Sequence, residues 1–115
     1  MVSAPDRMFR AFSDPTRLRL LHLLRAGELC VGDVVTVLNV PQPTASRHLA
    51  YLRKAGLIDS RKNSYWTFYA LAPARSAFHR KLLECLETCF RDVPHLAKDT
   101  ARLKTLRSHG GCCSS

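Results

Sequence analysis

The sequence predicts a mainly α-helical domain with one β-hairpin, arranged as a winged helix-turn-helix, and three observations support this fold class. The stretch from Pro41 to Leu57 has the period of a helix that is apolar on one side and basic on the other. A shorter predicted helix, ending near Asn39, precedes it after a tight turn, so the two form a helix-turn-helix. A run rich in aromatic residues, 65–71, follows as one strand of a hairpin.

Length and charge limit what the chain can be. Its 115 residues suffice for one domain with a modest core that would gain stability by forming an oligomer. There are 18 Lys and Arg residues against 9 Asp and Glu, which gives a net charge of +9. Acidic proteins and anionic membranes attract such a chain, but nucleic acid is the commonest partner of a small basic domain. Between residues 42 and 65 Asp59 is the only acid, so positive charge is concentrated around the basic helix.

Two helices are expected before the helix-turn-helix. Ser3 is a candidate N-cap of the first, whose apolar stripe includes Met8 and Phe9. Asp14 and Pro15 open the second, which carries leucines on several sides. A helix that is apolar on most of its surface is buried, so we expect the second helix at the centre of the core.

The third helix is the first half of the helix-turn-helix. Cys30 stands at its start, and Val34 and Val37 are expected to face inward. Asn39 suits the left-handed conformation that ends a helix.

The fourth helix is the candidate DNA-reading element. Pro43 suits the first helical position, Gly56 suits the C-terminal stop, and Ala45, Leu49 and Leu52 form a narrow apolar back. Its front suits the major groove of DNA, although an ordinary surface helix also has a polar side that meets water. The candidate groove-contacting residues are Gln42, Thr44, Ser46, Arg47 and His48.

The hairpin that follows is the candidate wing. Residues 57–61 form its first strand, Lys62, Asn63 and Ser64 its turn, and residues 65–71 its second strand. We expect Arg61, Lys62 and Asn63 to contact the DNA backbone or minor groove, because the tip of a wing reaches past the major groove. For Arg53 and Lys54 a solvated surface is the simpler interpretation.

A last long helix is predicted from Pro73, with a stripe of Phe78, Leu82, Cys85 and Cys89. Earlier elements already supply the core, so we assign this surplus stripe to a homodimer interface, together with the first helix. Residues 1–92 would then form the DNA-binding and dimerisation domain. Residues 93–115 would form a C-terminal tail with a short helix and a mobile end.

The cysteines bear on the cellular compartment. Five is an odd number, the N-terminus does not resemble a signal peptide, and no apolar run approaches the ~20 residues that span a bilayer. We therefore expect a cytoplasmic protein, without a membrane partner, whose cysteines are reduced thiols. They are Cys30, Cys85, Cys89, Cys112 and Cys113.

Four segments, in order, resemble the ArsR/SmtB family: Asp-Pro-Thr-Arg-Leu at 14–18, Gly-Glu-Leu-Cys-Val-Gly-Asp-Val at 27–34, Gln-Pro-Thr-Ala-Ser-Arg-His-Leu at 42–49, and Leu-Arg-Lys-Ala-Gly-Leu at 52–57. That family consists of homodimeric winged-helix repressors of bacterial metal and metalloid resistance operons. Within it the chain looks most like the arsenical-resistance repressors. The resemblance covers roughly residues 5–92 and implies that the unliganded dimer holds a palindromic operator and that inducer binding releases it.

The sequence also departs from the family pattern. The arsenic-sensing third helix reads Glu-Leu-Cys-Val-Cys-Asp, but Gly32 stands here where the second cysteine would be, so Cys30 alone cannot form that site. The last helix lacks the histidine and carboxylate set of the zinc sensors, and His79 is isolated. Pro41 replaces a residue that is often Ser, which removes a hydroxyl cap and a phosphate contact.

Cysteine chemistry suggests the inducer. Soft thiolates select thiophilic ions, and trivalent arsenic or antimony takes three thiolates. We predict a metal site of Cys89, Cys112 and Cys113, with Cys85 as the competitor of Cys89. Cysteines on an apolar stripe are often only small hydrophobic residues, and Cys30 is most simply an N-cap whose thiol is activated by the helix N-terminus.

Two alternatives have the same elements. One is a repressor of the same fold that senses zinc, cadmium or thiol oxidation, and the other is a basic architectural DNA-binding protein with incidental cysteines. We predict no enzyme and no catalytic cofactor. The sequence contains no phosphate-cradling Gly-rich loop and no His, Cys and carboxylate set that the fold would bring into one pocket.

Overall fold

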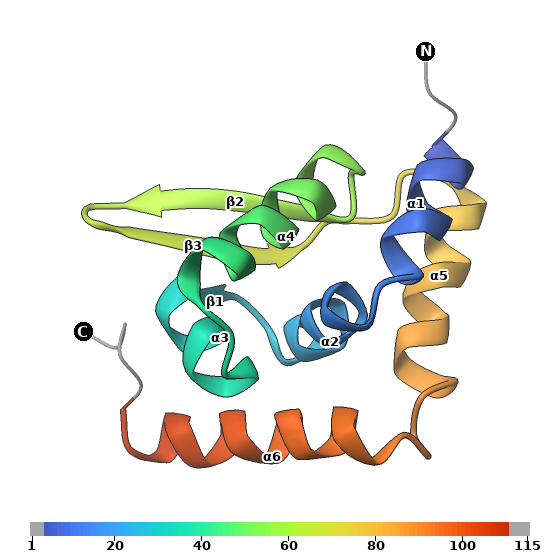
Figure 1. Cartoon of the computed structure of the whole chain (residues 1–115). Helices are drawn as coiled ribbons and strands as arrows, with labels where there is room; N and C mark the ends of the chain where they lie inside the picture. Colours follow the sequence, from blue (N-terminus) through green and yellow to red (C-terminus); the bar gives the residue numbers. More distant parts are fainter. Residues whose placement is uncertain (1–3, 111–115) are drawn as a thin grey trace.

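Six α-helices and a three-stranded sheet make up residues 4–110, the part of the chain that this computed structural model describes (Figure 1). The predicted fold class, a mainly α-helical winged helix-turn-helix, is confirmed. None of these helices is both long and apolar enough to cross a bilayer. The elements are α1 (Ala4–Phe12), α2 (Pro15–Leu23), a 3-10 turn (Leu24–Ala26), β1 (Leu29–Cys30), α3 (Val31–Leu38), α4 (Gln42–Lys54), β2 (Ile58–Asn63), β3 (Trp66–Leu71), α5 (Ala77–Thr88) and α6 (Pro94–Ser108).

Helix α2 lies at the centre of the core, as its leucines predict. The Asp14 carboxylate caps its N-terminus by accepting a hydrogen bond from the Arg17 amide at 3.0 Å. Leu20 and Leu21 are fully buried. Ser3, the predicted cap of α1, lies outside the described residues.

Helices α3 and α4 form the helix-turn-helix. Asn39 ends α3 with a φ of 56°, the left-handed conformation expected of it. The chain then enters α4 at Gln42, one residue earlier than predicted. Ala45, Leu49 and Leu52 are fully buried, which confirms the predicted apolar back of α4 and turns its other side outward.

The sheet consists of the wing hairpin and one short strand that the sequence analysis missed. The strand order is β1-β3-β2, and all pairs are antiparallel. Asn63 pairs with Trp66, so the turn consists of Ser64 and Tyr65 rather than the predicted Lys62, Asn63 and Ser64. Ser64 makes this two-residue turn possible by taking a φ of 61°.

Helix α5 begins at Ala77, four residues later than the predicted start at Pro73. The Ser76 hydroxyl accepts a hydrogen bond from the His79 amide at 3.0 Å, which caps the helix. A capping side chain satisfies an amide that has no partner within the helix, so this local contact decides the start of α5.

Helix α6 is longer than the short helix predicted after residue 92. It has 15 residues and runs beneath α2 and α3, as Figure 1 shows. Leu96 and Leu103 are buried against the core, and Asp99 forms an ion pair with Arg19 of α2 at 2.8 Å. These long-range contacts fix α6, because only a narrow line of its residues is apolar.

Candidate nucleic-acid interface and cysteine sites

The outward side of α4 carries the predicted reading residues. The buried back of the helix holds it against α2 and α3, so its front is presented by a rigid element. Gln42, Ser46 and Arg47 are exposed, whereas Thr44 and His48 are half-buried. Exposed amide, hydroxyl and guanidinium groups on one helix face are the groups that read base edges in a major groove.

His48 differs from its neighbours because it turns toward α2. Its Nδ1 lies 4.0 Å from an Asp14 carboxylate oxygen, and only 15% of its side chain is exposed. Burial lowers the pKa of His48, although the Asp14 carboxylate acts in the opposite direction. The imidazole therefore lies at the contact between α4 and α2, and only a small part of it is accessible from outside.

Of the three predicted wing residues, Arg61 already has an ionic partner. Its guanidinium donates two hydrogen bonds of 2.7 Å to the Glu28 carboxylate and lies 4.7 Å from the centre of the Phe68 ring. The hydrogen bond from Arg61 lowers the pKa of Glu28. Lys62 and Asn63 are exposed in β2. Arg61 thus braces the wing, while Lys62 and Asn63 are accessible to a ligand.

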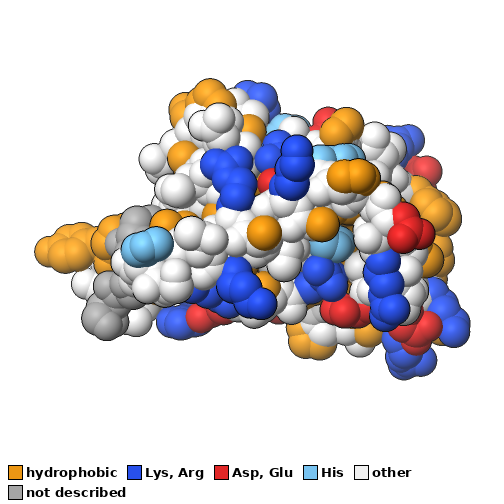
Figure 2. All heavy atoms as spheres, turned by 90° about the horizontal axis from the view of Figure 1, so that it is seen from below, with side chains coloured by type: hydrophobic (Ala, Val, Ile, Leu, Met, Phe, Trp, Pro, Cys, Tyr) orange, Lys and Arg blue, Asp and Glu red, His pale blue; other side chains and the backbone are white. Residues whose placement is uncertain are grey.

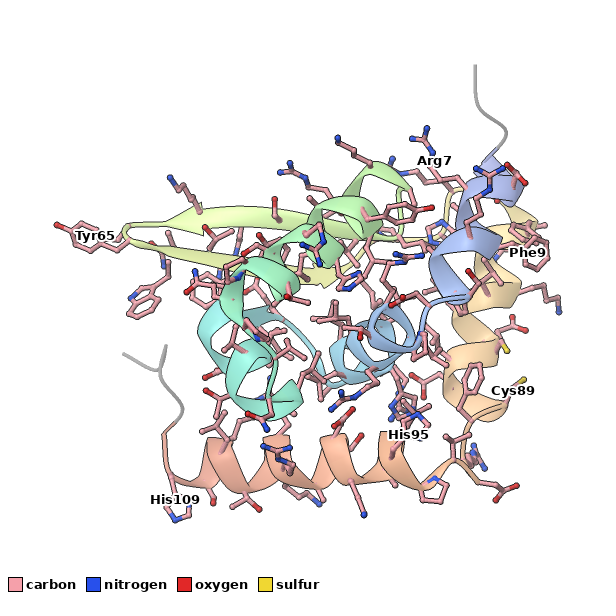
Figure 3. All side chains as sticks on the ribbon, viewed as in Figure 1. Arg7, Phe9, Tyr65, Cys89, His95 and His109 are labelled. Carbon is pink, nitrogen blue, oxygen red and sulfur yellow. The ribbon has the colours of Figure 1, made fainter. Side chains whose placement is uncertain are left out.

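The tip of the wing is aromatic, which the sequence analysis overlooked. Tyr65 is 95% exposed, and Figure 3 shows it at the far end of the hairpin. Trp66 is 43% exposed. The register of the hairpin places both residues at or beside the turn, but the predicted turn lay two residues earlier and so assigned them to a strand.

Cys85 of α5 and Cys89, the C-cap residue of that helix, form a pair of free thiols four positions apart. Cys85 is half-buried, and burial, followed by the neighbouring Cys89, raises its pKa to about 11. Hydrogen bonds from Cys85 and then from the Thr88 hydroxyl lower the pKa of the exposed Cys89. Cys89 is therefore the member of the pair that more readily forms a thiolate.

Cys30 occupies the N-cap of α3, as predicted, and is almost completely buried. It is disulfide-bonded, so the expectation of a reduced thiol does not hold for it in this structure. Cys112 and Cys113 lie outside the described residues. His79 is buried, accepts a hydrogen bond from the Arg75 amide through Nδ1, and has a pKa lowered by burial.

The C-terminal end of α6 lies beside β1 and far from Cys89, which follows α5. The Arg107 guanidinium donates hydrogen bonds to the carbonyl oxygens of Ala26 and Glu28, both at 3.4 Å. Figure 3 shows Cys89 near one end of α6 and His109 at the other. The described end of α6 therefore lies close to the strand that contains Cys30.

Within residues 4–110, no three His, Cys, Asp or Glu side chains are grouped closely enough to hold a metal ion. A three-thiolate site in a single chain would thus need at least one ligand from beyond Gly110.

Helices α1 and α5 pack together and leave an apolar surface. The rings of Phe9 and Phe78 meet edge to face, with centroids 5.0 Å apart, and Phe9 is still 59% exposed. Leu82 is half-buried on the same stripe of α5. Helix α1 thus packs against this stripe within one chain, and the homodimer interface expected of the two stays a prediction.

Comparison with known proteins gives consistent matches. A family model described as "Bacterial regulatory protein, arsR family" matches residues 14–60, from the start of α2 into the wing. The Arsenical resistance operon repressor of Escherichia coli K12 is 37% identical over 112 residues, which cover 96% of each chain. The Arsenic resistance transcriptional regulator ArsR2 of Pseudomonas putida is 36% identical over 107 residues, which cover 92% of this chain and 90% of the relative. Among solved structures, HlyU from Vibrio cholerae N16961 has a TM-score of 0.68 at 28% identity, covering 79% of this chain and 92% of that one.

Proposed function

The chain belongs to the ArsR family of bacterial transcriptional repressors, and we propose that it binds a palindromic operator as a homodimer and releases it when cysteine thiolates capture trivalent arsenic or antimony. It is a DNA-binding regulator and not an enzyme. The observation that carries the DNA-binding proposal is the exposed polar front of α4, held on a fully buried back and followed by a wing.

The proposed division of labour on DNA follows from side-chain chemistry. Arg47 has the fork geometry that suits a guanine edge, and Gln42 suits adenine. Thr44, Ser46 and His48 add hydrogen-bonding groups along the same helix. Lys62 and Asn63 on the wing reach the DNA backbone or minor groove, and Arg61 joins them only if it leaves Glu28.

A homodimer is proposed through α1 and α5. Phe9 exposes more than half of its surface, and next to it lies the half-buried stripe of Phe78 and Leu82. A second copy that covers this face would bury the apolar surface and place two reading helices about one turn of DNA apart.

The position of α6 supports Cys112 and Cys113 as part of the inducer site and points to Cys30 as their third partner. Cys112 and Cys113 follow Gly110 by two and three positions, which span about 7–11 Å at most. Helix α6 alone is ~22 Å long, so the terminal pair of the same chain cannot return to Cys89 while α6 stays docked. Cys30 lies two residues after Glu28, to which Arg107 is bonded.

This ligand set would connect the inducer to the DNA-binding elements. Cys30 pairs with Phe68 across the sheet, and Phe68 pairs with Arg61 of the wing. An ion held at Cys30 must bind the DNA-incompetent arrangement more tightly, or it cannot shift the equilibrium. A coupling of ~1–3 kcal/mol per site is enough for useful derepression. We infer that the ion acts by displacing β1 and, with it, the wing.

Thiol oxidation is the second candidate signal, and one observation favours it. Cys30 is disulfide-bonded, whereas an arsenic ligand must be a reduced thiolate. If the bond forms reversibly in the cell, then oxidation moves the same strand that the ion would move.

The experiment measures operator binding by fluorescence anisotropy on reduced protein, with arsenite, antimonite, zinc, cadmium or peroxide added separately. We expect release by arsenite and antimonite. Release by peroxide alone would replace the metalloid with oxidation as the signal, and release by zinc or cadmium alone would replace it with a divalent metal. Footprinting on the promoter must show a discrete palindromic site, since an architectural protein gives none.

Cysteine variants then identify the ligands. Cys30→Ser and the double variant Cys112→Ser/Cys113→Ser should need at least ~10-fold more arsenite, which corresponds to a loss of about 1.4 kcal/mol. Cys85→Ser is the matched control and should respond like the wild type, as should Cys89→Ser. Loss of the response in Cys89→Ser with a normal response in Cys30→Ser would restore Cys89 as the third ligand.

A further inference from the structure

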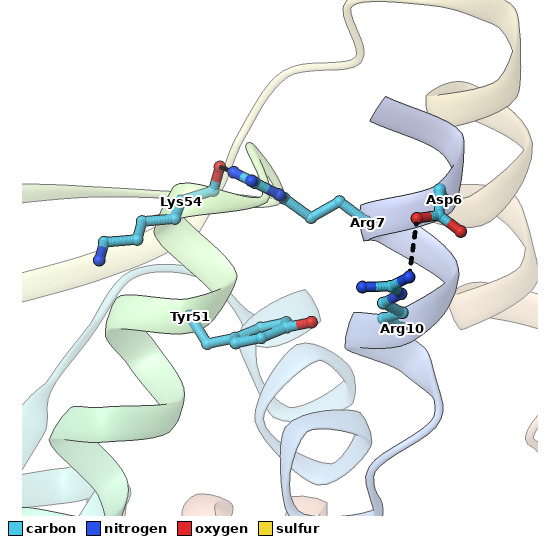
Figure 4. A pocket seen from close by; sticks show the side chains of 5 residues that line it. All are labelled: Asp6, Arg7, Arg10, Tyr51 and Lys54. Atoms are coloured by element: carbon cyan, nitrogen blue, oxygen red, sulfur yellow. Dashed lines mark hydrogen bonds and ion pairs between the residues drawn. The ribbon is translucent and has the colours of Figure 1, made fainter. Parts of the chain in front are cut away.

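A basic pocket lies where the end of α4 meets α1, shown from close by in Figure 4. Its volume is about 290 Å³. Its lining combines three cations with one acid and a phenol, which gives it a net charge of +2 (three minus one). The lining residues are Asp6, Arg7, Arg10, Tyr51 and Lys54.

The pocket continues the reading face of α4. Arg47, Tyr51 and Lys54 are spaced i, i+4 and i+7, so they lie along one side of the helix. From Arg47 to Lys54 the helix rises ~10 Å. The major groove is about 12 Å wide, so a helix that reads base edges with Arg47 brings its Lys54 end to the phosphate backbone.

The walls of the pocket are held by specific contacts. The Arg7 guanidinium donates to the Lys54 carbonyl oxygen at 3.2 Å, and Arg10 forms an ion pair with Asp6 at 3.3 Å. The guanidinium of Arg17 lies 4.1 Å from the centre of the Tyr51 ring. These contacts orient the three basic side chains without neutralising all of them, because the pocket contains only one carboxylate.

A purely structural role explains only part of this arrangement. The C-terminus of a helix carries a partial negative charge, and one basic side chain near its last carbonyl groups offsets it. Arg7 meets that need by its bond to Lys54. Arg10 is paired with Asp6, although its side chain is 70% exposed, so the charge that no contact explains is that of the exposed Lys54.

We propose that this pocket binds one phosphate of the operator backbone at the border of the major groove that α4 reads. Arg7, Arg10 and Lys54 supply charge, and the Tyr51 hydroxyl supplies a neutral donor. The contact fixes how deeply α4 enters the groove and carries no sequence information. This inference rests on the proposed function, because it places the DNA by means of α4.

The first test compares Arg7→Gln, Arg10→Gln and Lys54→Gln with Lys98→Gln and Lys104→Gln, which remove the same charge from exposed positions of α6. Each pocket variant should flatten the dependence of log K on log salt by ~0.9. The ratio of the wild-type binding constant to that of the variant should therefore fall about 3.5-fold between 50 and 200 mM salt. Operator and random DNA should be weakened equally, and the α6 controls should change neither quantity.

The second test locates the phosphate. Operator fragments carry one neutral methylphosphonate at each backbone position in turn. At one position per half-site, the methylphosphonate should weaken DNA binding by the wild type but leave binding by Arg7→Gln and Lys54→Gln unchanged. A pocket that acts only as a helix cap would instead lower the melting temperature of these variants, with the salt slope and the methylphosphonate pattern unchanged, and that result overturns the inference. A wild type that lacks specific operator binding refutes the proposed function itself.

Discussion

Helices α4 and α6 are organised by opposite means. Helix α4 buries Ala45, Leu49 and Leu52 at a strict helical spacing and is followed by a hairpin next to it in sequence. Helix α6 is mostly polar, and its position depends on partners that lie about 80 residues earlier, such as Arg19 and Ala26. Figure 2, which looks onto the molecule from the α6 side, shows basic side chains dispersed over that face with acidic ones between some of them.

The difference separates two tasks. An element whose back is completely buried and whose neighbours are local presents its front rigidly, which suits the reading of base edges. Helix α6 combines the buried Leu96 and Leu103 with discrete long-range polar bonds, and bonds of this kind can be strengthened or broken by a ligand, which suits regulation. This contrast agrees with the roles proposed above, in which the α4 end reads DNA and the α6 end takes part in sensing.

The largest predicted effect tests whether α6 belongs to the core. Leu103→Ala should destabilise the protein by about 2–5 kcal/mol, because it removes a buried side chain and leaves a cavity. Urea unfolding gives the free energy, and Thr105→Ala on the exposed side of the same helix is the control. An equal, small effect of both variants would mean that α6 only rests on the surface.

The next effect concerns the ion pair between α2 and α6. Asp99→Asn should cost about 1.5–3 kcal/mol, since Asp99 is 3% exposed and accepts hydrogen bonds of 2.8 and 2.9 Å from Arg19. The double variant Arg19→Leu/Asp99→Leu should recover much of the loss, because it leaves no unpaired buried charge. Chemical unfolding measures both, and a double variant no more stable than Asp99→Asn would contradict the explanation.

The elements that could be predicted from the sequence are those whose determinants are local, as in α4, and the ones that were missed depend on long-range contacts, as in α6. The helices α2 to α4 and the hairpin were predicted because each has its apolar period, cap or turn residue within a few positions, as Asp14, Asn39 and Gly56 show. The two-residue strand β1 is too short to have a period, and its existence depends on β3, which lies 38 residues later. The extent of α6 was missed because its contacts are long-range.

The candidate sites show the same limit. The front of α4 follows from the helical period alone, so its outward residues were predictable. The pairing of Arg61 with Glu28 was not, because 33 residues separate them in the sequence. The separation of Cys89 from the C-terminal end of α6 was also hidden, since it requires knowing that Pro94–Ser108 form one continuous helix.

The third prediction concerns the roles of α4 and of the wing in DNA binding. Arg47→Ala should relax preference at one operator position by about 1–3 kcal/mol, because a base-edge contact is lost. Lys62→Ala should instead weaken all sequences equally and flatten the salt slope by ~0.9. Binding measured on operators with single base changes at several salt concentrations separates the two. A uniform loss in both variants would refute the division between a reading helix and a positioning wing.

The fourth prediction uses two buried histidines as probes of the region around α2 and α5. Burial lowers the pKa of His22, with Arg25 acting in the same direction, and burial lowers that of His79. A folded-state pKa below the ordinary 6.5 means that the unfolded state takes up the proton first as pH falls.

The stability that comes from the neutral imidazoles is therefore complete above about pH 6.5 and is lost as pH falls toward their lower folded-state pKa values. Each group adds at most about 1.4 kcal/mol per pH unit to the slope. His22→Gln and His79→Gln should each reduce that slope in unfolding experiments between pH 7 and 5. An unchanged slope in both variants would assign the acid sensitivity to other groups.

The smallest expected effect lies where the two regions meet, at Glu28. Its carboxylate holds Arg61 of the wing, and its carbonyl oxygen accepts a hydrogen bond from Arg107 of α6. Glu28→Gln removes the charge that competes with DNA phosphate for Arg61 but keeps the backbone bond. DNA binding should tighten on all sequences, and the salt slope should steepen by up to ~0.9.

Arg61→Ala is the informative companion to this change. In the wild-type background it should weaken DNA binding less than Lys62→Ala does, because Arg61 is already paired. In the Glu28→Gln background the same substitution should weaken binding about as much as Lys62→Ala. If Arg61→Ala has the same effect in both backgrounds, the two ends of the molecule do not communicate through this ion pair. The coupling proposed between Cys30 and the wing would then rest on the strand pairing with Phe68.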